Sequence, residues 1–164
     1  MEYRIREADI DRLDSIRQFV SIVMSSLYPK GAYQENPHDL VFFEQVYVQP
    51  AHAGFFIAER SDGELLGTAA VRPYDRRFPE LESAMDAGAA CEMVKFYIHP
   101  DGRRQGIGSR LYERAERFAR EAGYDVSYLH TSLYLPGGYP FWRSCGYVDC
   151  FRESEQIVHM SKRL

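Results

Sequence analysis

The sequence has few cysteines and no long apolar run, and both shortages narrow the class of protein. Its three cysteines, Cys91, Cys145 and Cys150, lack the spacing of metal ligands, so we expect structural thiols and no metal. No segment approaches about 18 consecutive apolar residues, so we expect no membrane span. The first residues alternate like a strand and carry no apolar signal region. These absences predict a cytoplasmic protein in a reducing compartment, without a membrane partner.

The chain also lacks an excess of basic residues. It has 24 acidic and 20 basic side chains and a net charge of −4, whereas a nucleic-acid-binding surface needs a basic excess. With 45% hydrophobic and 27% charged residues, the composition is typical of a globular protein. No linker, repeat or low-complexity segment is evident. We therefore expect one domain over residues 1–164, with no nucleic acid among its partners.

The stretch from Cys91 to Gly123 contains the clearest pattern. It predicts a strand over residues 91–98, then a break at residues 99–102, where proline and Asp-Gly favour a turn. An amphipathic helix is expected from Ile107, and Gly123 suits its C-terminal end. Its apolar face consists of residues three and four apart: Ile107, Leu111, Ala115, Phe118 and Ala122.

The turn before this helix has the features of an anion site. The first N–H groups of a helix have no internal partner and lie at the positive end of its dipole. Gly106 and Gly108 leave the backbone accessible, and Arg103 and Arg104 add cationic donors. No Gly-Lys-Ser/Thr triplet follows, and Leu111 stands where a dinucleotide fingerprint has its third glycine. A tight turn that merely starts a helix is the alternative interpretation.

The segment Arg103-Arg104-Gln105-Gly106-Ile107-Gly108 resembles motif A of the GNAT acyltransferase superfamily, Arg/Gln-x-x-Gly-x-Gly/Ala. Residues 92–98 also resemble the central strand of that family. The resemblance implies acetyl-CoA as co-substrate, with its pyrophosphate on the turn and its pantetheine arm along the central strand. It implies these cofactor-binding residues: Phe96, Tyr97, Ile98, Arg103, Arg104, Gln105, Gly106, Ile107, Gly108 and Ser109.

The remaining elements can be sought along the whole chain. Strands are expected at residues 3–7, 54–60, 65–72, 91–98, 125–131, 147–151 and 155–160, and helices at about 9–27, 36–46, 107–122 and 137–145. Residues 73–89 form a long connection that is either partly helical or a mobile loop. The order β-α-α-β-β-β-α-β-α-β-β matches the GNAT arrangement. The fold class is therefore α/β (α+β), with a central mixed, mostly antiparallel β-sheet flanked by helices.

Glu92 is the first candidate catalytic residue. It lies in the expected central strand, at the position where several GNAT enzymes carry a general base. A carboxylate in an apolar strand is costly unless it is paired, and burial favours the pKa of a base. The alternative is a structural ion pair with Lys95 or a nearby arginine, or simple exposure to solvent.

The segment from Phe141 to Tyr147 departs from the family pattern. Trp142 occupies the slot where the family often has a tyrosine, the acid for the leaving thiolate, and Leu135 replaces a frequent asparagine. Tyr139 and Tyr134 are the substitutes expected from their positions, and both are also interpretable as core residues. Tyr139 is preferred, because a helix over residues 137–145 would place it on the face of Trp142. His130 is assigned no role.

The resemblance implies an N-acetyltransferase that transfers an acetyl group from acetyl-CoA to a primary amine by direct attack. The acceptor, a small molecule or a peptide, is not identified by the sequence. Residues 27–33 and 73–89 are expected to choose it. Two alternatives are a catalytically idle CoA-binding module and a transferase that uses a longer acyl-CoA. The sequence leaves both a monomer and a homodimer open.

Overall fold

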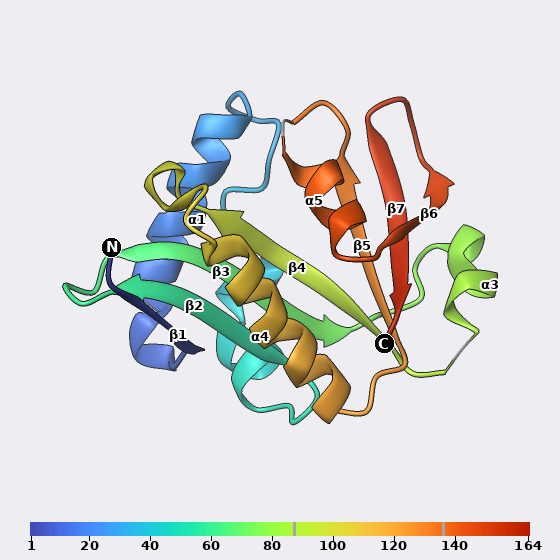
Figure 1. The fold of residues 1–164 in the computed structure, drawn as a ribbon, viewed down its shortest axis with the longest axis horizontal. Helices are drawn as coiled ribbons and strands as arrows, with labels where there is room; N and C mark the ends of the chain where they lie inside the picture. Colours follow the sequence, from blue (N-terminus) through green and yellow to red (C-terminus); the bar gives the residue numbers. More distant parts are fainter. Residues whose placement is uncertain (87, 136) are drawn as a thin grey trace.

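A computed structural model describes residues 1–86, 88–135 and 137–164, which build a β-sheet with helices on both faces (Figure 1). The strands are β1 (Tyr3–Glu7), β2 (Gly54–Arg60), β3 (Leu65–Pro73), β4 (Ala90–Ile98), β5 (Val126–Ser132), β6 (Val148–Arg152) and β7 (Ile157–Arg163). The α-helices are α1 (Leu13–Leu27), α2 (His38–Val41), α3 (Glu82–Met85), α4 (Ile107–Glu121) and α5 (Gly138–Ser144). Short 3₁₀ turns and one π-helical turn, Glu44–Val48, complete the described elements.

The seven strands form a sheet in the order β1-β2-β3-β4-β5-β7-β6. Every neighbouring pair is antiparallel except β4 and β5, which are parallel. A parallel pair needs a crossover connection, and α4 provides it by returning the chain across one face of the sheet (Figure 1). The order of elements and the mostly antiparallel sheet are as the sequence predicts.

The helices bury different faces of the sheet. Helix α4 presents Ile107, Leu111 and Ala115, all fully buried, to one face, as their spacing predicts. Helix α1 covers the opposite face, where Ile16 and Val20 pack among the buried residues of β2 and β3. In Figure 1 α4 and α5 lie in front of the sheet and α1 behind it. A third cluster lies at the end of the sheet covered by α3.

In two segments the structure differs in detail from the sequence prediction. The helix expected over residues 36–46 is divided, with α2 followed by the π-helical turn Glu44–Val48. The connection 73–89 is partly helical: it contains the 3₁₀ turn Pro79–Leu81 and α3, whose Leu81 and Met85 are fully buried. Residue 87 of this connection lies outside the described residues. Burial of two apolar side chains explains why this segment packs against the sheet.

Strand β4 is irregular in its C-terminal half. Its register with β3 shifts between Thr68 and Ala70, and Lys95 has a φ of 53°, so β4 carries an extra residue in a bulge. The Thr68 hydroxyl donates a hydrogen bond of 2.7 Å to the Lys95 carbonyl and holds the bulge. On its other edge, β4 pairs with β5 only from Ala90 to Glu92. Beyond that point the two strands diverge (Figure 1).

Candidate active site

A cleft of about 1020 Å³ opens where β4 and β5 diverge. Its walls include residues 92–98 of β4 and residues 129–132 of β5, together with side chains from the C-terminal half of α1. The turn that precedes α4 and the start of α5 close its ends. Because the strands separate, backbone groups of both strands line the cleft instead of bonding to each other.

The turn before α4 leaves its backbone bare. Gly106 adopts a φ of 76° at the N-cap of α4, a conformation that most side chains disfavour, and a Cβ there would meet no atom within 4 Å. Arg104 also has a positive φ, 60°. With no side chain at Gly106 to cap the helix, the first N–H groups of α4 are available to an anion. This geometry fits a phosphate group.

Most residues predicted to bind the cofactor line this cleft. They are Phe96, Tyr97, Ile98, Arg103, Arg104, Gly106, Gly108 and Ser109. Two others lie elsewhere: Ile107 is fully buried in the core, and the Gln105 side chain donates to the Asp101 carbonyl at 2.5 Å. Ile107 can therefore contact a ligand only through its backbone.

Glu92 lies in the cleft wall, and two arginines hold its carboxylate. Its side chain is 1% exposed, and Arg77 donates to its two oxygens at 3.0 and 2.6 Å. Arg72 donates to one of the same oxygens at 3.3 and 3.4 Å. The structure therefore realises the ion pair that the sequence left as the alternative to catalysis, with arginines rather than with Lys95. A catalytic role for Glu92 stays a prediction.

Lys95 pairs with a different carboxylate. Its Nζ lies 3.0 Å from Oδ2 of the buried Asp39, which also accepts a hydrogen bond of 2.6 Å from the Tyr47 hydroxyl. Burial alone would raise the pKa of Asp39, but Lys95, Tyr47 and the more distant Arg72 outweigh it and lower that pKa. Burial, together with Asp39, raises the pKa of Tyr47. This cluster ties α2 to β3 and β4 beneath the cleft.

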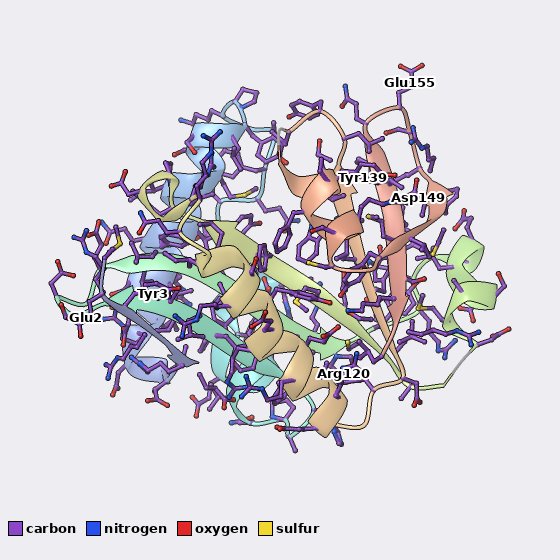
Figure 2. The ribbon with its side chains drawn as sticks, in the orientation of Figure 1. Glu2, Tyr3, Arg120, Tyr139, Asp149 and Glu155 are labelled. Carbon is purple, nitrogen blue, oxygen red and sulfur yellow. The ribbon has the colours of Figure 1, made fainter. Side chains whose placement is uncertain are left out.

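The two tyrosines predicted to protonate the thiolate do not line the cleft among the described residues. Tyr139 donates its hydroxyl to both oxygens of Asp149 at 2.9 Å, and Figure 2 shows this pair between α5 and β6. Tyr134 is 55% exposed. Trp142 does line the cleft and is held among Phe96, Phe141 and other rings. The acid role of Tyr139 or Tyr134 stays a prediction that this geometry does not favour.

Two ring side chains that the sequence left without a role, Tyr28 and His130, line the cleft together with Tyr97, which was expected to bind the cofactor. Burial, with the neighbouring Tyr134, raises the pKa of Tyr28, and burial raises the pKa of Tyr97 to about 12. Tyr28 follows the last turn of α1, and no periodicity of the sequence indicated that it faces β4. His130 was detectable as an ionisable side chain within the expected strand, two residues after Tyr128.

Comparison with known proteins agrees with this geometry. The model of the acetyltransferase (GNAT) family matches residues 16–147, which is most of the chain. The chain belongs to the GNAT acetyltransferase family. Membership confirms the resemblance carried by the glycine turn and the central strand, and it makes the protein an acyltransferase.

Relatives of this GNAT chain include an aminoglycoside N(6')-acetyltransferase type 1 of Klebsiella aerogenes, 30% identical over 77% of the chain and 83% of that protein. The N-acetyltransferase YjgM of Escherichia coli is 29% identical over 63% of the chain, which spans about half of that relative's length, 55%.

Solved GNAT structures share the whole fold. A Staphylococcus aureus acetyltransferase has a TM-score of 0.80 at 15% identity and covers 99% of both chains. The yncA protein of Salmonella typhimurium, solved with its cofactor acetyl-CoA, has a TM-score of 0.71 at 18% identity and matches 100% of this chain and 95% of its own.

Two features are absent from the part of this GNAT chain that the structure describes. No group of three or more His, Cys, Asp or Glu side chains there has the arrangement of a metal site. None of the helices there is both long and apolar enough to cross a bilayer.

The low pKa of Asp39 predicts an acid-dependent stability. The folded state releases the Asp39 proton at a lower pH than the unfolded chain, whose aspartates have a pKa of about 3.9. The contribution of Asp39 to the free energy of unfolding is therefore complete above about pH 5, and it is lost as the pH falls toward the pKa of Asp39 in the folded state. Asp39→Asn should lower the free energy of unfolding at pH 7 by about 1–3 kcal/mol, since Lys95 loses its partner.

Urea unfolding at pH 7, 5 and 3.5 tests this prediction. The difference between wild type and Asp39→Asn should shrink as the pH falls. Glu155→Gln removes an exposed carboxylate that points away from the protein (Figure 2) and is the matched control, with little effect at any of these pH values. A difference that stays constant from pH 7 to 3.5 would contradict the assigned pKa direction.

Proposed function

We propose that this GNAT protein transfers the acetyl group of acetyl-CoA to a primary amine by direct attack of the amine on the thioester. The observation that carries the proposal is the cleft between the diverging β4 and β5, which ends at the bare N-terminus of α4. A chain that binds a thioester in this way needs an electrostatic partner for the carbonyl oxygen and a path for the amine.

The residues of this chain fit the parts of acetyl-CoA in order. The N–H groups at the start of α4, with Arg103 and Arg104, would hold the pyrophosphate. Backbone groups of Phe96 and Ile98, in the part of β4 that does not pair with β5, would hold the pantetheine arm. The Phe96 N–H would polarise the thioester carbonyl. Alkyl thiols have a pKa not far above neutrality, so the leaving thiolate needs only weak assistance.

The charges in the cleft favour some acceptors over others. Glu92 is the only acidic side chain among its described lining residues, and Arg72 and Arg77 already neutralise it. Arg72 and Lys95 also line the cleft, and each already lies beside a buried carboxylate, Glu92 and Asp39 respectively. A polycation would have no free carboxylate to bind. We therefore propose an acceptor with a single ammonium group, carrying neutral or anionic substituents, rather than an aminoglycoside.

Binding of acetyl-CoA is the first test. A ligand of the folded state raises the melting temperature as its concentration exceeds Kd. Wild type should therefore be stabilised by acetyl-CoA, and Gly106→Val should weaken binding by at least about tenfold, through the added side chain and the strain at a φ of 76°.

A control variant separates the effect of backbone strain at residue 106 from obstruction of the anion site by the added side chain. Asn tolerates a left-handed backbone better than Val, so Gly106→Asn should retain the unfolding temperature of the free wild type. Calorimetric titration of folded variants gives Kd directly. An equal Kd for acetyl-CoA in wild type and folded Gly106→Val would contradict the assignment of the turn.

A panel of amines tests the activity and the acceptor class together. Release of free CoA should be measured with kanamycin, spermidine, L-phenylalanine, L-methionine and a short neutral peptide. We expect the highest kcat/KM among the monoamines and at least about tenfold lower values for the two polycations, because like charges in the cleft oppose their entry. Preference for kanamycin would contradict the acceptor class, and binding without any turnover would favour the idle CoA-binding module.

The same assay, repeated with longer acyl-CoA donors, decides the acyl preference. A higher kcat/KM with a longer acyl chain than with acetyl-CoA would favour the second alternative.

The role of Glu92 follows from whether its substitution changes mainly kcat or mainly KM. Because Arg72 and Arg77 occupy its oxygens, we propose that Glu92 helps to orient the acceptor by holding these two arginines in place, rather than by removing the acceptor's proton. Glu92→Gln should then raise KM for the amine several-fold with a smaller effect on kcat. A fall in kcat of roughly 10²-fold, with loss of the acidic limb of the pH–rate profile, would instead make Glu92 the base.

A further inference from the structure

A row of polar rings crosses β5 and β7 beside the cleft. Tyr128 and His130 lie two residues apart on β5, so their side chains share one face of the sheet. His159 of β7 is the direct cross-strand partner of His130, and the two ring centroids are 5.5 Å apart. The Tyr128 and His159 rings are stacked, with centroids 5.7 Å apart. The row begins in the cleft, which His130 lines.

Hydrogen bonds connect these rings to the surface. The Tyr128 hydroxyl lies 2.6 Å from Nδ1 of His159 and 3.4 Å from Nδ1 of His130. On its other side, Nε2 of His159 lies 3.3 Å from Oε1 of Glu153. The His159 side chain is 1% exposed and that of Glu153 is 42% exposed. The chain of contacts therefore runs from the cleft, through buried groups, to a carboxylate in solvent.

One set of tautomers satisfies every contact in the row. His130 donates its Nδ1–H to the Tyr128 oxygen, and the Tyr128 O–H donates to Nδ1 of His159. His159 then donates its Nε2–H to Glu153. In this arrangement Nε2 of His130 carries a lone pair, and no hydrogen bond to it is found in the described part of the chain. It is the atom of the row left to accept a proton.

The position of His130 relative to the divergence of the strands is specific. Tyr128 is the last residue of β5 that pairs with β4, opposite Glu92. His130 is the next residue on the same face, so it is the first side chain of that face beyond the divergence. His130 is an exposed residue of β5, and it lines the cleft. Under the proposed function, the amine and the thioester meet in this opening.

We propose that His130 is the general base of the acetyl transfer and that Tyr128 and His159 pass the proton on to Glu153. This inference rests on the proposed function and adds a catalytic residue to it. The ammonium group of the acceptor loses a proton to Nε2 of His130 and becomes a neutral amine. The Nδ1 proton of His130 moves to the Tyr128 oxygen as the Tyr128 proton moves to His159. The Nε2 proton of His159 moves to Glu153 and then to water, so one proton leaves and no charge accumulates. The second proton that the nitrogen loses on acylation goes to the leaving CoA thiolate, and proton exchange with water returns the row to its first tautomers.

The electrostatics of the row agree with this role. Desolvation by the groups packed around it lowers the pKa of His130 below its ordinary value, although the residue keeps an exposed side. Glu92 on β4 and Glu153 oppose the shift, while His159 on β7 and Arg77 add to it. His130 is therefore neutral at pH 7 and able to accept a proton. Burial, with Glu92, raises the pKa of Tyr128, so its hydroxyl passes a proton only while receiving another. Aromatic packing alone would not require this polar path to the surface.

Three variants test the proposal in the full-length protein. His130→Gln should lower kcat/KM roughly 10²-fold, as expected for loss of a general base. Tyr128→Phe keeps the ring but removes the hydroxyl, and should lower kcat/KM by about tenfold and shift the acidic limb of the pH profile to lower pH. His52→Gln, in an exposed loop outside the cleft, is the matched control and should match wild type. The substrate is the amine of highest kcat/KM in the panel.

Two further measurements separate the possible failures. Calorimetry should give the same Kd for acetyl-CoA in all four proteins, which shows that the variants are folded. Nitrogen NMR of labelled histidines should find His130 protonated at Nδ1 and His159 at Nε2. An active wild type with unchanged kcat/KM and acidic limb in His130→Gln, or the opposite tautomer of His130, overturns the inference alone. A wild type that acetylates no amine overturns the proposed function and the inference with it.

Discussion

The short parallel pairing of β4 with β5 is the constraint on which the site depends. The two strands share only the register from Ala90 to Glu92, and beyond it the sheet has no continuous hydrogen-bond ladder. Unpaired backbone groups are costly unless they meet water or a ligand, so the sheet tolerates the gap only because the cleft is accessible. Helix α4 stabilises this arrangement, since it both connects the strands and directs its N-terminus to the end of the gap.

The second constraint is charge. Carboxylates under the cleft are buried, and each is balanced by cations from other elements: Asp39 by Lys95, and Glu92 by Arg72 and Arg77. A buried ion pair adds little stability by itself, but removal of one partner is strongly destabilising. These pairs therefore fix the relative positions of α2, β3 and β4. The same pairing leaves the described lining of the cleft with more positive than negative charge.

Local patterns made much of the fold predictable from the sequence. The apolar spacing of α4, the glycine turn before it and the alternation in the strands all act over a few residues, and each element formed where expected. The ion pairs of Glu92 were harder to predict from the sequence. Arg77 lies fifteen residues away in a connection without periodicity, and its meeting with Glu92 depends on tertiary packing. The hydrogen bond of Tyr139 to Asp149 likewise joins separate elements, which a helical wheel cannot reveal.

The bulge at Lys95 has a consequence for which face each residue of β4 occupies. In a regular strand, Phe96 would lie on the face of Glu92 and Val94. One extra residue reverses the alternation, so Phe96 joins the cluster under α4 and α5 with Met93, while Tyr97 joins Val94 on the α1 face. One strand thus supplies an aromatic support for Trp142 on one side and a phenol for the cleft on the other. Deletion of one residue here would exchange those two surfaces.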